Sequence, residues 1–293
     1  MQHRTTIRPA KGIHVVVPTE KVRATIAVSG LGTGDKRSMF LVPWGDLTYL
    51  GTTDTDYDGS LDDPQCTPAD VEYLLQGFNR WFREPLTTAD VVGTWAGLRP
   101  LVKSAKSERT ADLSRRHAVN RSASGVVTIT GGKLTTYREM ASDAIDEVVD
   151  TFDSPPHDWQ RCRTAKLRLR GATAGDHDDH LYARYGSEAS AVRAIMAEAP
   201  EFGDRLVPEL PYLNAEAVYA VRHEMATTLD DIFSRRTRAR LMLRDATAAV
   251  AQDVAALVAP ELGWSAGDQA AEVEAYRASV AEERATPELP ITS

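Results

Sequence analysis

The sequence Thr128-Ile-Thr-Gly-Gly-Lys-Leu-Thr-Thr-Tyr-Arg138 predicts a strand that turns directly into a helix. A β-branched run ends in Gly131 and Gly132, and an amphipathic pattern begins after Lys133. Glycines leave the backbone of such a turn bare, and the first N–H groups of a helix have no partner within it. Because these groups carry partial positive charge, the junction suits an anionic oxygen or a polarised carbonyl. We therefore expect an electron-rich ligand at this turn.

Composition limits the classes of protein to which the chain can belong. Its 293 residues are enough for a sizeable core in one or two domains. The 42 acidic against 34 basic residues argue against nonspecific binding to nucleic acid. Two cysteines, Cys66 and Cys162, favour a reducing compartment over a disulfide framework or a zinc site. No apolar run approaches the roughly 18 residues that span a bilayer, so we expect a soluble, cytoplasmic protein.

The first half of the chain has the pattern of an α+β domain. Runs rich in β-branched and aromatic residues predict strands at 13–17, 24–28, 38–42, 47–50, 91–95 and 126–130. Thr67 as N-cap and Pro68 at the first helical position predict a helix whose apolar face packs on the sheet. A second helix is predicted at about 134–149. Its expected inward residues are Tyr137, Ala141, Ala144, Ile145 and Val148.

The second half is alanine-rich and helical in pattern. Glycine and proline breaks fall at 171–175, 200, 208–211 and 260–263. A proline-containing stretch at 152–157 separates the two patterns. We therefore predict an α+β domain over residues 1–150, a linker over 151–160, an all-α domain over 161–285 and a tail over 286–293.

One glycine-rich segment resembles a phosphate-binding loop but differs from it in spacing. Gly30-Leu-Gly-Thr-Gly34 has the pattern G-x-G-x-G and joins two predicted strands. A dinucleotide fingerprint needs G-x-G-x-x-G opening a helix. We interpret the segment as a hairpin loop, and no other segment supplies the fingerprint.

Several segments, taken in order, carry a resemblance to a known family. They are Lys11-Gly-Ile-His-Val-Val-Val-Pro18, Phe40-Leu-Val-Pro-Trp-Gly45, Gly51-Thr-Thr-Asp54, Trp95-Ala-Gly-Leu-Arg-Pro-Leu101, Ser114-Arg115, Gly131-Gly-Lys-Leu-Thr-Thr-Tyr-Arg138, Val221-Arg-His-Glu-Met-Ala226 and Leu229-Asp-Asp-Ile-Phe-Ser-Arg-Arg-Thr-Arg238. As an ordered series they resemble the C-terminal part of FAD-dependent glycerol-3-phosphate dehydrogenase, the quinone-linked enzyme. The resemblance extends from Lys11 to about Gly263.

This resemblance implies a fold. It places a substrate-domain β-sheet first, with the last strand and helix of a DAO-type FAD-binding domain, and an all-α C-terminal domain after it. Members of the family begin with a Rossmann-type βαβ unit that holds the FAD pyrophosphate, and this sequence starts after that unit. We interpret the sequence as truncated, and a separately encoded N-terminal portion is the alternative. The chain alone is expected to bind FAD weakly.

The resemblance also implies an activity. It is the oxidation of sn-glycerol 3-phosphate to dihydroxyacetone phosphate, with hydride transfer to FAD and electrons passed to a membrane quinone. The alternatives are the related oxidase, which uses oxygen, and a non-catalytic remnant or separate subunit. Peripheral contact with the inner face of the cell membrane and a homodimer are compatible with this assignment.

Three residues are candidates for the substrate site. By resemblance, Arg99 contacts substrate over the flavin, and Arg115 is a second contact, with Arg116 as the alternative register. An arginine fork suits a phosphate dianion better than the point charge of lysine. The structural alternatives are a salt-bridged surface arginine for Arg99 and a solvated basic turn for Arg115. His14 points opposite to Ile13 and Val15 and could accept the hydroxyl proton as hydride leaves, or it is a hydrogen-bonded core histidine.

The glycine turn supplies the candidate flavin contacts. Reduced flavin carries negative charge on its pyrimidine side, which backbone N–H groups can stabilise. By resemblance the contacts are Gly131, Gly132, Lys133, Leu134 and Thr135, and Lys133 also pairs with flavin or substrate phosphate. Helix capping is the alternative role for Thr135 and its neighbour Thr136.

Three polar segments have simpler interpretations. Asp54 has the pattern of a turn residue, although it could also face the site. Asp176-His-Asp-Asp-His180 is expected to cap a helix, and we expect no metal site. The basic run at 235–240 is expected to form ion pairs with Asp230 and Asp231, with contact to an anionic membrane as the alternative.

Overall fold

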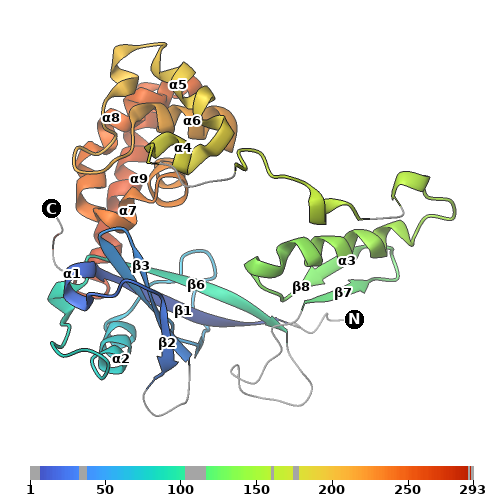
Figure 1. Cartoon of the computed structure of the whole chain (residues 1–293), viewed down its shortest axis with the longest axis horizontal. Coiled ribbons are helices and arrows are strands. Elements are labelled where there is room, and N and C mark those ends of the chain that lie inside the picture. Colours follow the sequence, from blue (N-terminus) through green and yellow to red (C-terminus); the bar gives the residue numbers. More distant parts are fainter. Residues whose placement is uncertain are drawn as a thin grey trace. The chain divides into compact units, whose positions relative to one another are not determined.

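A computed structural model of the chain describes residues 7–32, 38–102, 117–159, 162–173, 178–289 and 291 (Figure 1). They form two compact units whose segments alternate along the sequence. Unit 1 comprises the described residues of Met1–Gly12, Thr53–Pro64 and Ala96–Leu169. Unit 2 comprises those of Ile13–Thr52, Gln65–Trp95 and Arg170–Ser293. The domain boundaries expected from the sequence stay a prediction.

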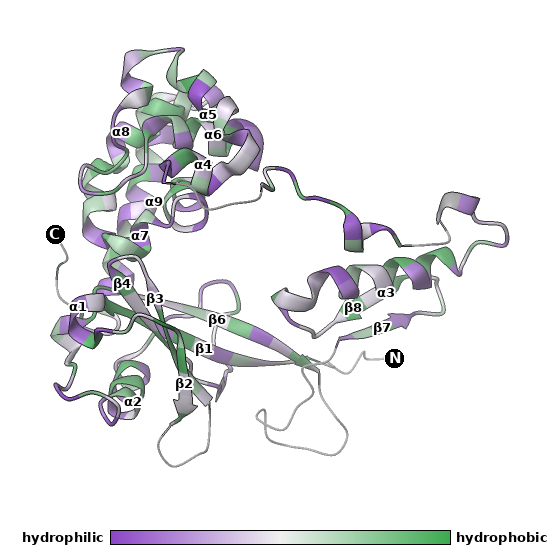
Figure 2. Ribbon diagram, in the orientation of Figure 1, coloured by the Kyte–Doolittle hydropathy of each residue, from purple (hydrophilic) through white to green (hydrophobic). Residues whose placement is uncertain are grey.

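The main sheet is built around a long first strand. β1 (Ile7–Pro18) pairs antiparallel with β4 and β5 and also pairs with β6. The sheet order is β2-β3-β4-β1-β5, with β6 on β1. The other strands are β2 (Val28–Leu31), β3 (Ser38–Trp44), β4 (Leu47–Gly51), β5 (Thr55–Asp56) and β6 (Gly93–Val102). The run from Val15 to Val17 is fully buried, and β1 is accordingly green (hydrophobic) over part of its length in Figure 2.

The predicted capped helix is confirmed. In α2 (Pro68–Phe78), the hydroxyl of Thr67 accepts the Asp70 N–H at 3.3 Å, and the Asp70 carboxylate accepts the Thr67 N–H at 3.0 Å. This reciprocal pairing satisfies two N–H groups at the helix start. Val71, Leu74 and Phe78 are buried, as an amphipathic helix requires.

The strand predicted at 24–28 was wrong in position. A short helix, α1 (Thr19–Val22), ends at Arg23 with a positive φ of 53°. The strand begins only at Val28, and Ile26 is 70% exposed, so no core contact holds this segment in the sheet. β2 pairs antiparallel with β3, so Gly30 and Leu31 lie within a strand. Thr33 and Gly34 of the predicted hairpin loop lie outside the described residues.

Unit 1 also contains a small hairpin covered by a helix. β7 (Ala118–Arg121) pairs with β8 (Val127–Thr130), and a 3-10 turn (Leu134–Thr136) leads into α3 (Tyr137–Val149). Two further 3-10 turns follow at His157–Trp159 and Thr164–Lys166.

The inward face predicted for α3 was wrong. Tyr137 is 54% exposed, Ile145 58% and Val148 37%, and no residue of α3 is fully buried. The helix turns a different face to the hairpin. That face includes Met140, whose sulfur lies against Gly132, and Asp143, which pairs with His117 at 2.6 Å. A two-stranded sheet covers only one narrow side of a helix, so apolar periodicity alone did not identify that side.

The C-terminal part of unit 2 is helical, as predicted. Its helices are α4 (His180–Tyr185), α5 (Ala189–Met196), α6 (Asn214–Glu224), α7 (Ala239–Met242), α8 (Arg244–Leu262) and α9 (Ala266–Ala285), with a π-helix at Asp231–Arg236 and 3-10 turns at Gly186–Glu188 and Pro200–Gly203. A further 3-10 turn (Thr88–Asp90) precedes β6. Leu229, Phe233 and Val258 are among its fully buried core residues. The break predicted at 260–263 is confirmed: α8 accepts Pro260 in its last turn and ends at Leu262, followed by Gly263 with a φ of +67°.

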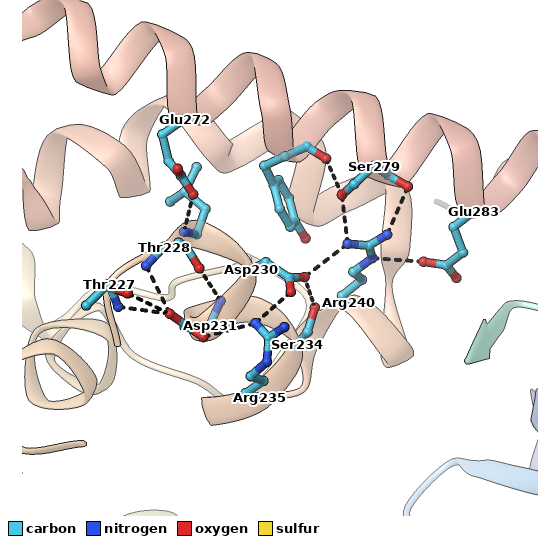
Figure 3. Close-up of polar contacts among 12 residues, drawn as sticks. Thr227, Thr228, Asp230, Asp231, Ser234, Arg235, Arg240, Glu272, Ser279 and Glu283 are labelled. Carbon is cyan, nitrogen blue, oxygen red and sulfur yellow. Dashed lines mark hydrogen bonds and ion pairs between the residues drawn. The ribbon is translucent and has the colours of Figure 1, made fainter. Parts of the chain in front are cut away.

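The basic run at 235–240 forms ion pairs within the chain, as expected (Figure 3). Arg235 contacts Asp230 at 2.7 Å and Asp231 at 2.9 Å. Arg240 contacts Asp230 at 3.1 Å and Glu283 at 2.8 Å. These contacts neutralise two of the arginines that a membrane-binding patch would have to present.

Candidate functional site

His14 lies among three aromatic side chains from neighbouring strands of unit 2. Its ring stacks on Trp95 at 4.7 Å between centroids, with an interplanar angle of 12°. Phe40 lies at 5.5 Å and Tyr49 at 6.1 Å, the latter edge-on. Stacking of this kind fixes the plane of the imidazole. His14 is half-buried, and its role as proton acceptor stays a prediction.

The His14 ring packs directly against the backbone of Gly51. The two residues are directly opposite each other in the β1–β4 ladder. A Cβ atom at position 51 would overlap Cδ2 of His14. Glycine is therefore required here by close approach, and any larger residue would displace the ring.

Arg99, on β6, is held by a buried turn within unit 1. Its Nη1 donates to the Thr53 carbonyl at 3.1 Å and contacts Oδ1 of Asp54 at 3.4 Å. The guanidinium lies against the bare backbone of Gly12, where a Cβ atom would overlap it. The Arg99 side chain is 25% exposed and that of Asp54 is 10% exposed. Arg99 is therefore salt-bridged, as in the structural alternative, but its side chain is only partly exposed. Its role in substrate binding stays a prediction.

Sequence reasoning underweighted two groups beside this arginine. Asp54 is buried and contacts Arg99, so it is more than a turn residue. Lys11 is also buried, with its ammonium 5.9 Å from the ring centre of Tyr57, and its carbonyl accepts the Thr53 hydroxyl at 3.3 Å. The sequence signal for both was the presence of Lys11-Gly and Gly51-Thr-Thr-Asp54 among the quoted segments. The ladders on either side of the Thr52–Asp54 turn bring them together, because His14 pairs with Gly51 and Lys11 pairs with Thr55. Two cations and one buried carboxylate within unit 1 favour an anionic ligand.

The glycine turn has the conformation that the sequence predicted. Gly131 and Gly132 have φ values of 76° and 78°, a region that side-chain-bearing residues rarely adopt. A Cβ atom on Gly132 would also overlap the Met140 side chain. Lys133 is extended, and the 3-10 turn begins at Leu134. This confirms a strand, a bare turn and a helix start at one place.

The local cap is made by Thr136. Its hydroxyl accepts the Lys133 N–H at 3.3 Å and donates to the Lys133 carbonyl at 3.0 Å. Lys133, Leu134 and Thr135 are exposed, with Leu134 at 87%. The residues present therefore fit a flat, electron-rich ring laid against a bare turn at a helix start. Their assignment as flavin contacts stays a prediction.

Arg115 and its alternative Arg116 lie outside the described residues. Of the Asp/His segment, Asp176 and His177 also lie outside them, whereas Asp179 caps α4 by accepting the Tyr182 N–H at 2.7 Å. Within the part of the chain that the structure describes, no group of three or more His, Cys, Asp or Glu side chains could hold a metal ion.

Cys162 is an exposed thiol to which the sequence analysis gave no role. Its Sγ lies 3.0 Å from the Thr164 hydroxyl. Hydrogen bonds from Ser142 and Thr164 lower the pKa of this thiol to about 7. The other cysteine, Cys66, is buried.

No helix in the described part of the chain is both long enough and apolar enough to cross a membrane.

Two family models match the chain. One, described as FAD dependent oxidoreductase, matches residues 1–138. The other, described as the C-terminal domain of alpha-glycerophosphate oxidase, matches residues 157–269.

Curated relatives are similar over most of the chain. A glycerol-3-phosphate dehydrogenase of Mycobacterium leprae is 40% identical over 295 residues, which cover 94% of this chain and 49% of that protein. A mitochondrial glycerol-3-phosphate dehydrogenase of Homo sapiens is 33% identical over 276 residues, covering 88% of this chain and 38% of that protein. The chain thus spans about half or less of the length of these relatives.

A solved structure is similar in fold. It is the glycerol-3-phosphate dehydrogenase from Bacillus halodurans complexed with FAD, at a TM-score of 0.74 and 28% identity. The match covers 96% of this chain and 57% of that one.

Proposed function

The chain belongs to the FAD-dependent glycerol-3-phosphate dehydrogenase family, and we propose that it carries the substrate end of such an enzyme. The expected fold class is confirmed: an FAD-oxidoreductase part of mixed sheet and helix is followed by a helical C-terminal domain. The proposed reaction oxidises glycerol 3-phosphate to dihydroxyacetone phosphate. The proposal rests on the position of Arg99, whose guanidinium packs on the backbone of Gly12 and contacts the Thr53 carbonyl and the Asp54 carboxylate.

Arg99 is proposed to bind the anionic substrate. Its Nη1 is engaged by Thr53 and Asp54, so the plane of the guanidinium is fixed before substrate arrives. Charge-assisted hydrogen bonds from a pre-oriented arginine are strong and directional. Arg115 is proposed as a second contact on the resemblance alone.

His14 is proposed to accept the substrate hydroxyl proton. Oxidation of a secondary alcohol removes that proton and a hydride from the same C–O unit. When FAD is bound, it supplies the hydride acceptor. The stacked Trp95 and the Gly51 backbone fix the ring plane, which a general base requires for a directed hydrogen bond.

The Gly131–Thr135 turn is proposed to hold the flavin. Its exposed backbone lies at the start of a helix, where N–H groups favour negative charge. Lys133 adds a cation at the same place, and it is proposed to pair with flavin or substrate phosphate.

Two electron acceptors are supported by different observations. The dehydrogenase relatives and the family resemblance favour a membrane quinone, reached by peripheral contact. The match of residues 157–269 to a domain of alpha-glycerophosphate oxidase favours oxygen. Quinone is our proposal. It requires faster glycerol-3-phosphate-dependent reduction of a soluble quinone than of oxygen, and hydrogen peroxide as the main product would support the oxidase.

The substrate proposal is tested by calorimetric binding of glycerol 3-phosphate to the purified chain and by dye reduction with FAD present. Arg99→Ala should abolish binding. The control is Arg121→Ala, which removes an exposed arginine of the same unit that pairs with Glu147 at 3.4 Å. Equal binding by both variants would overturn the role of Arg99.

A further inference from the structure

We propose that the C-terminal helices position His14, through a polar contact from Glu283 to the backbone of β6. The inference rests on the proposed function, because it concerns the residue proposed to accept the substrate proton. Glu283 and Arg240 are positioning residues in this account, since neither is proposed to touch substrate. All residues involved belong to unit 2.

The contact that joins helix to strand is made by Glu283, on α9. Its Oε1 accepts the Thr94 N–H at 3.3 Å, across 189 residues of sequence. Its Oε2 accepts Nε of Arg240 at 2.8 Å. Thr94 is 4% exposed, and only 12% of the Glu283 side chain is exposed. One carboxylate thus holds a strand with one oxygen and an arginine with the other.

Arg240 fixes the carboxylate from the other side (Figure 3). Its Nη1 donates to Asp230 at 3.1 Å and to the Ser279 hydroxyl at 2.9 Å, and its Nη2 donates to the Ser279 carbonyl at 3.0 Å. Burial raises the pKa of Glu283, and the charge of Arg240 opposes this rise. Because the pair is largely desolvated, loss of Glu283 removes one of the two carboxylates that compensate the Arg240 charge and leaves Asp230 as the other.

A second contact holds the strand one residue earlier. Gly93 is the first residue of β6, and a Cβ atom there would lie 3.1 Å from the Leu241 carbonyl oxygen of α7. The helices therefore contact β6 at two successive residues, Gly93 and Thr94. Trp95 is the next residue of the same strand.

Trp95 connects the position of the β6 backbone to the position of the His14 ring. The indole stacks on the imidazole at 4.7 Å and also contacts the ring of Tyr49 at 5.6 Å. A shift of the Thr94 backbone therefore moves the indole against which the imidazole rests. Misplacement of a reacting group by about 1 Å can cost roughly a hundredfold in rate, so a partial shift is expected to cost about tenfold.

The test compares Glu283→Ala with a matched control in the same helices. Glu261→Ala removes a carboxylate that pairs with Arg222 at 2.6 Å and is not bonded to the sheet in the described contacts. Glu283→Gln keeps an oxygen for the Thr94 N–H but loses the charge toward Arg240. The readouts are the imidazole NMR signals of His14, assigned with His14→Gln, together with kcat, KM and the urea midpoint of unfolding.

Glu283→Ala is expected to shift the His14 signals and to lower kcat about tenfold with KM little changed. In Glu283→Gln, the shift of the His14 signals and the loss of kcat should both be smaller than in Glu283→Ala. Glu261→Ala should lower only the urea midpoint. Unmoved His14 signals in a folded Glu283→Ala chain would overturn the inference. If Glu283→Ala fails to fold, Gly93→Ala replaces it in the test, because its Cβ would press on the Leu241 carbonyl oxygen and move the same part of β6. The His14 signals are again expected to shift. A wild-type chain that binds no glycerol 3-phosphate would defeat the proposed function, while the NMR comparison would still decide the coupling.

Discussion

Replacement of Gly12 by alanine tests the position of Arg99. The new Cβ would overlap the guanidinium, and no side chain larger than hydrogen fits between the β1 backbone and that group. The guanidinium is the far end of a flexible side chain, so it can swing away at a cost in stability below about 2 kcal/mol. Substrate would lose an oriented charge-assisted contact that contributes roughly 1.5–3 kcal/mol. Because each ~1.4 kcal/mol is a factor of ten, KM for glycerol 3-phosphate should rise about 10- to 100-fold.

The matched control for Gly12→Ala is Gly97→Ala. Gly97 is a strand glycine of the same unit, and a Cβ atom there meets no atom within 4 Å. The assay is KM in dye reduction, or the Kd from calorimetry, alongside the urea midpoint. If Gly12→Ala keeps the KM of Gly97→Ala while the guanidinium is displaced, Arg99 does not bind substrate.

Three further predictions concern the glycine turn, the exposed thiol and the helical core. Gly132→Ala should weaken FAD binding at least tenfold, because the new Cβ overlaps Met140 and displaces the turn. The control is Gly125→Ala, which introduces a side chain at a φ of +87° with no atom within 4 Å, so it causes backbone strain without a steric overlap. Cys162 should be alkylated by iodoacetamide with a half-maximal rate near pH 7, because its pKa is lowered to about 7, whereas buried Cys66 should react slowly; a Cys162 rate that still rises steeply above pH 8 would contradict this lowered pKa. Burial opposes ionisation of Glu216, but hydrogen bonds from His180 and the Leu213 N–H and the charge of Arg184 lower its pKa below the usual value. A lowered folded-state pKa gives stability that is fully present well above the unfolded pKa of about 4.3 and is lost as pH falls from there through the lower folded-state pKa. Between about pH 5 and about pH 3 the urea midpoint should therefore drop by less in Glu216→Gln than in wild type.

Local chemistry made part of the fold predictable. Thr67, Pro68 and Asp70 define a helix start because capping is decided by residues three positions apart. The Gly131-Gly132 turn was predictable for the same reason, since a strand pattern precedes it and a helix pattern follows it, and glycine tolerates the positive φ values found there.

Contacts between distant segments were not predictable. The face that α3 turns to the hairpin depends on His117, twenty-six residues from its partner Asp143, and not on the periodicity of the helix. Asp54 has the local pattern of a turn residue, and only its contact with Arg99, forty-five residues away, gives it a further role. The aromatic cluster around His14 was not predictable either, because its three other members come from separate strands that only the folded sheet brings together.

The central claim is that this chain carries the substrate end of a flavin site. Its most direct test is the flavin spectrum of the chain with FAD, recorded without oxygen before and after addition of glycerol 3-phosphate. Glycerol 3-phosphate is expected to bleach the oxidised flavin band in the wild type and to leave it unchanged in Arg99→Ala. A bound flavin that glycerol 3-phosphate leaves oxidised in the wild type, or that it bleaches equally in Arg99→Ala, would contradict this claim.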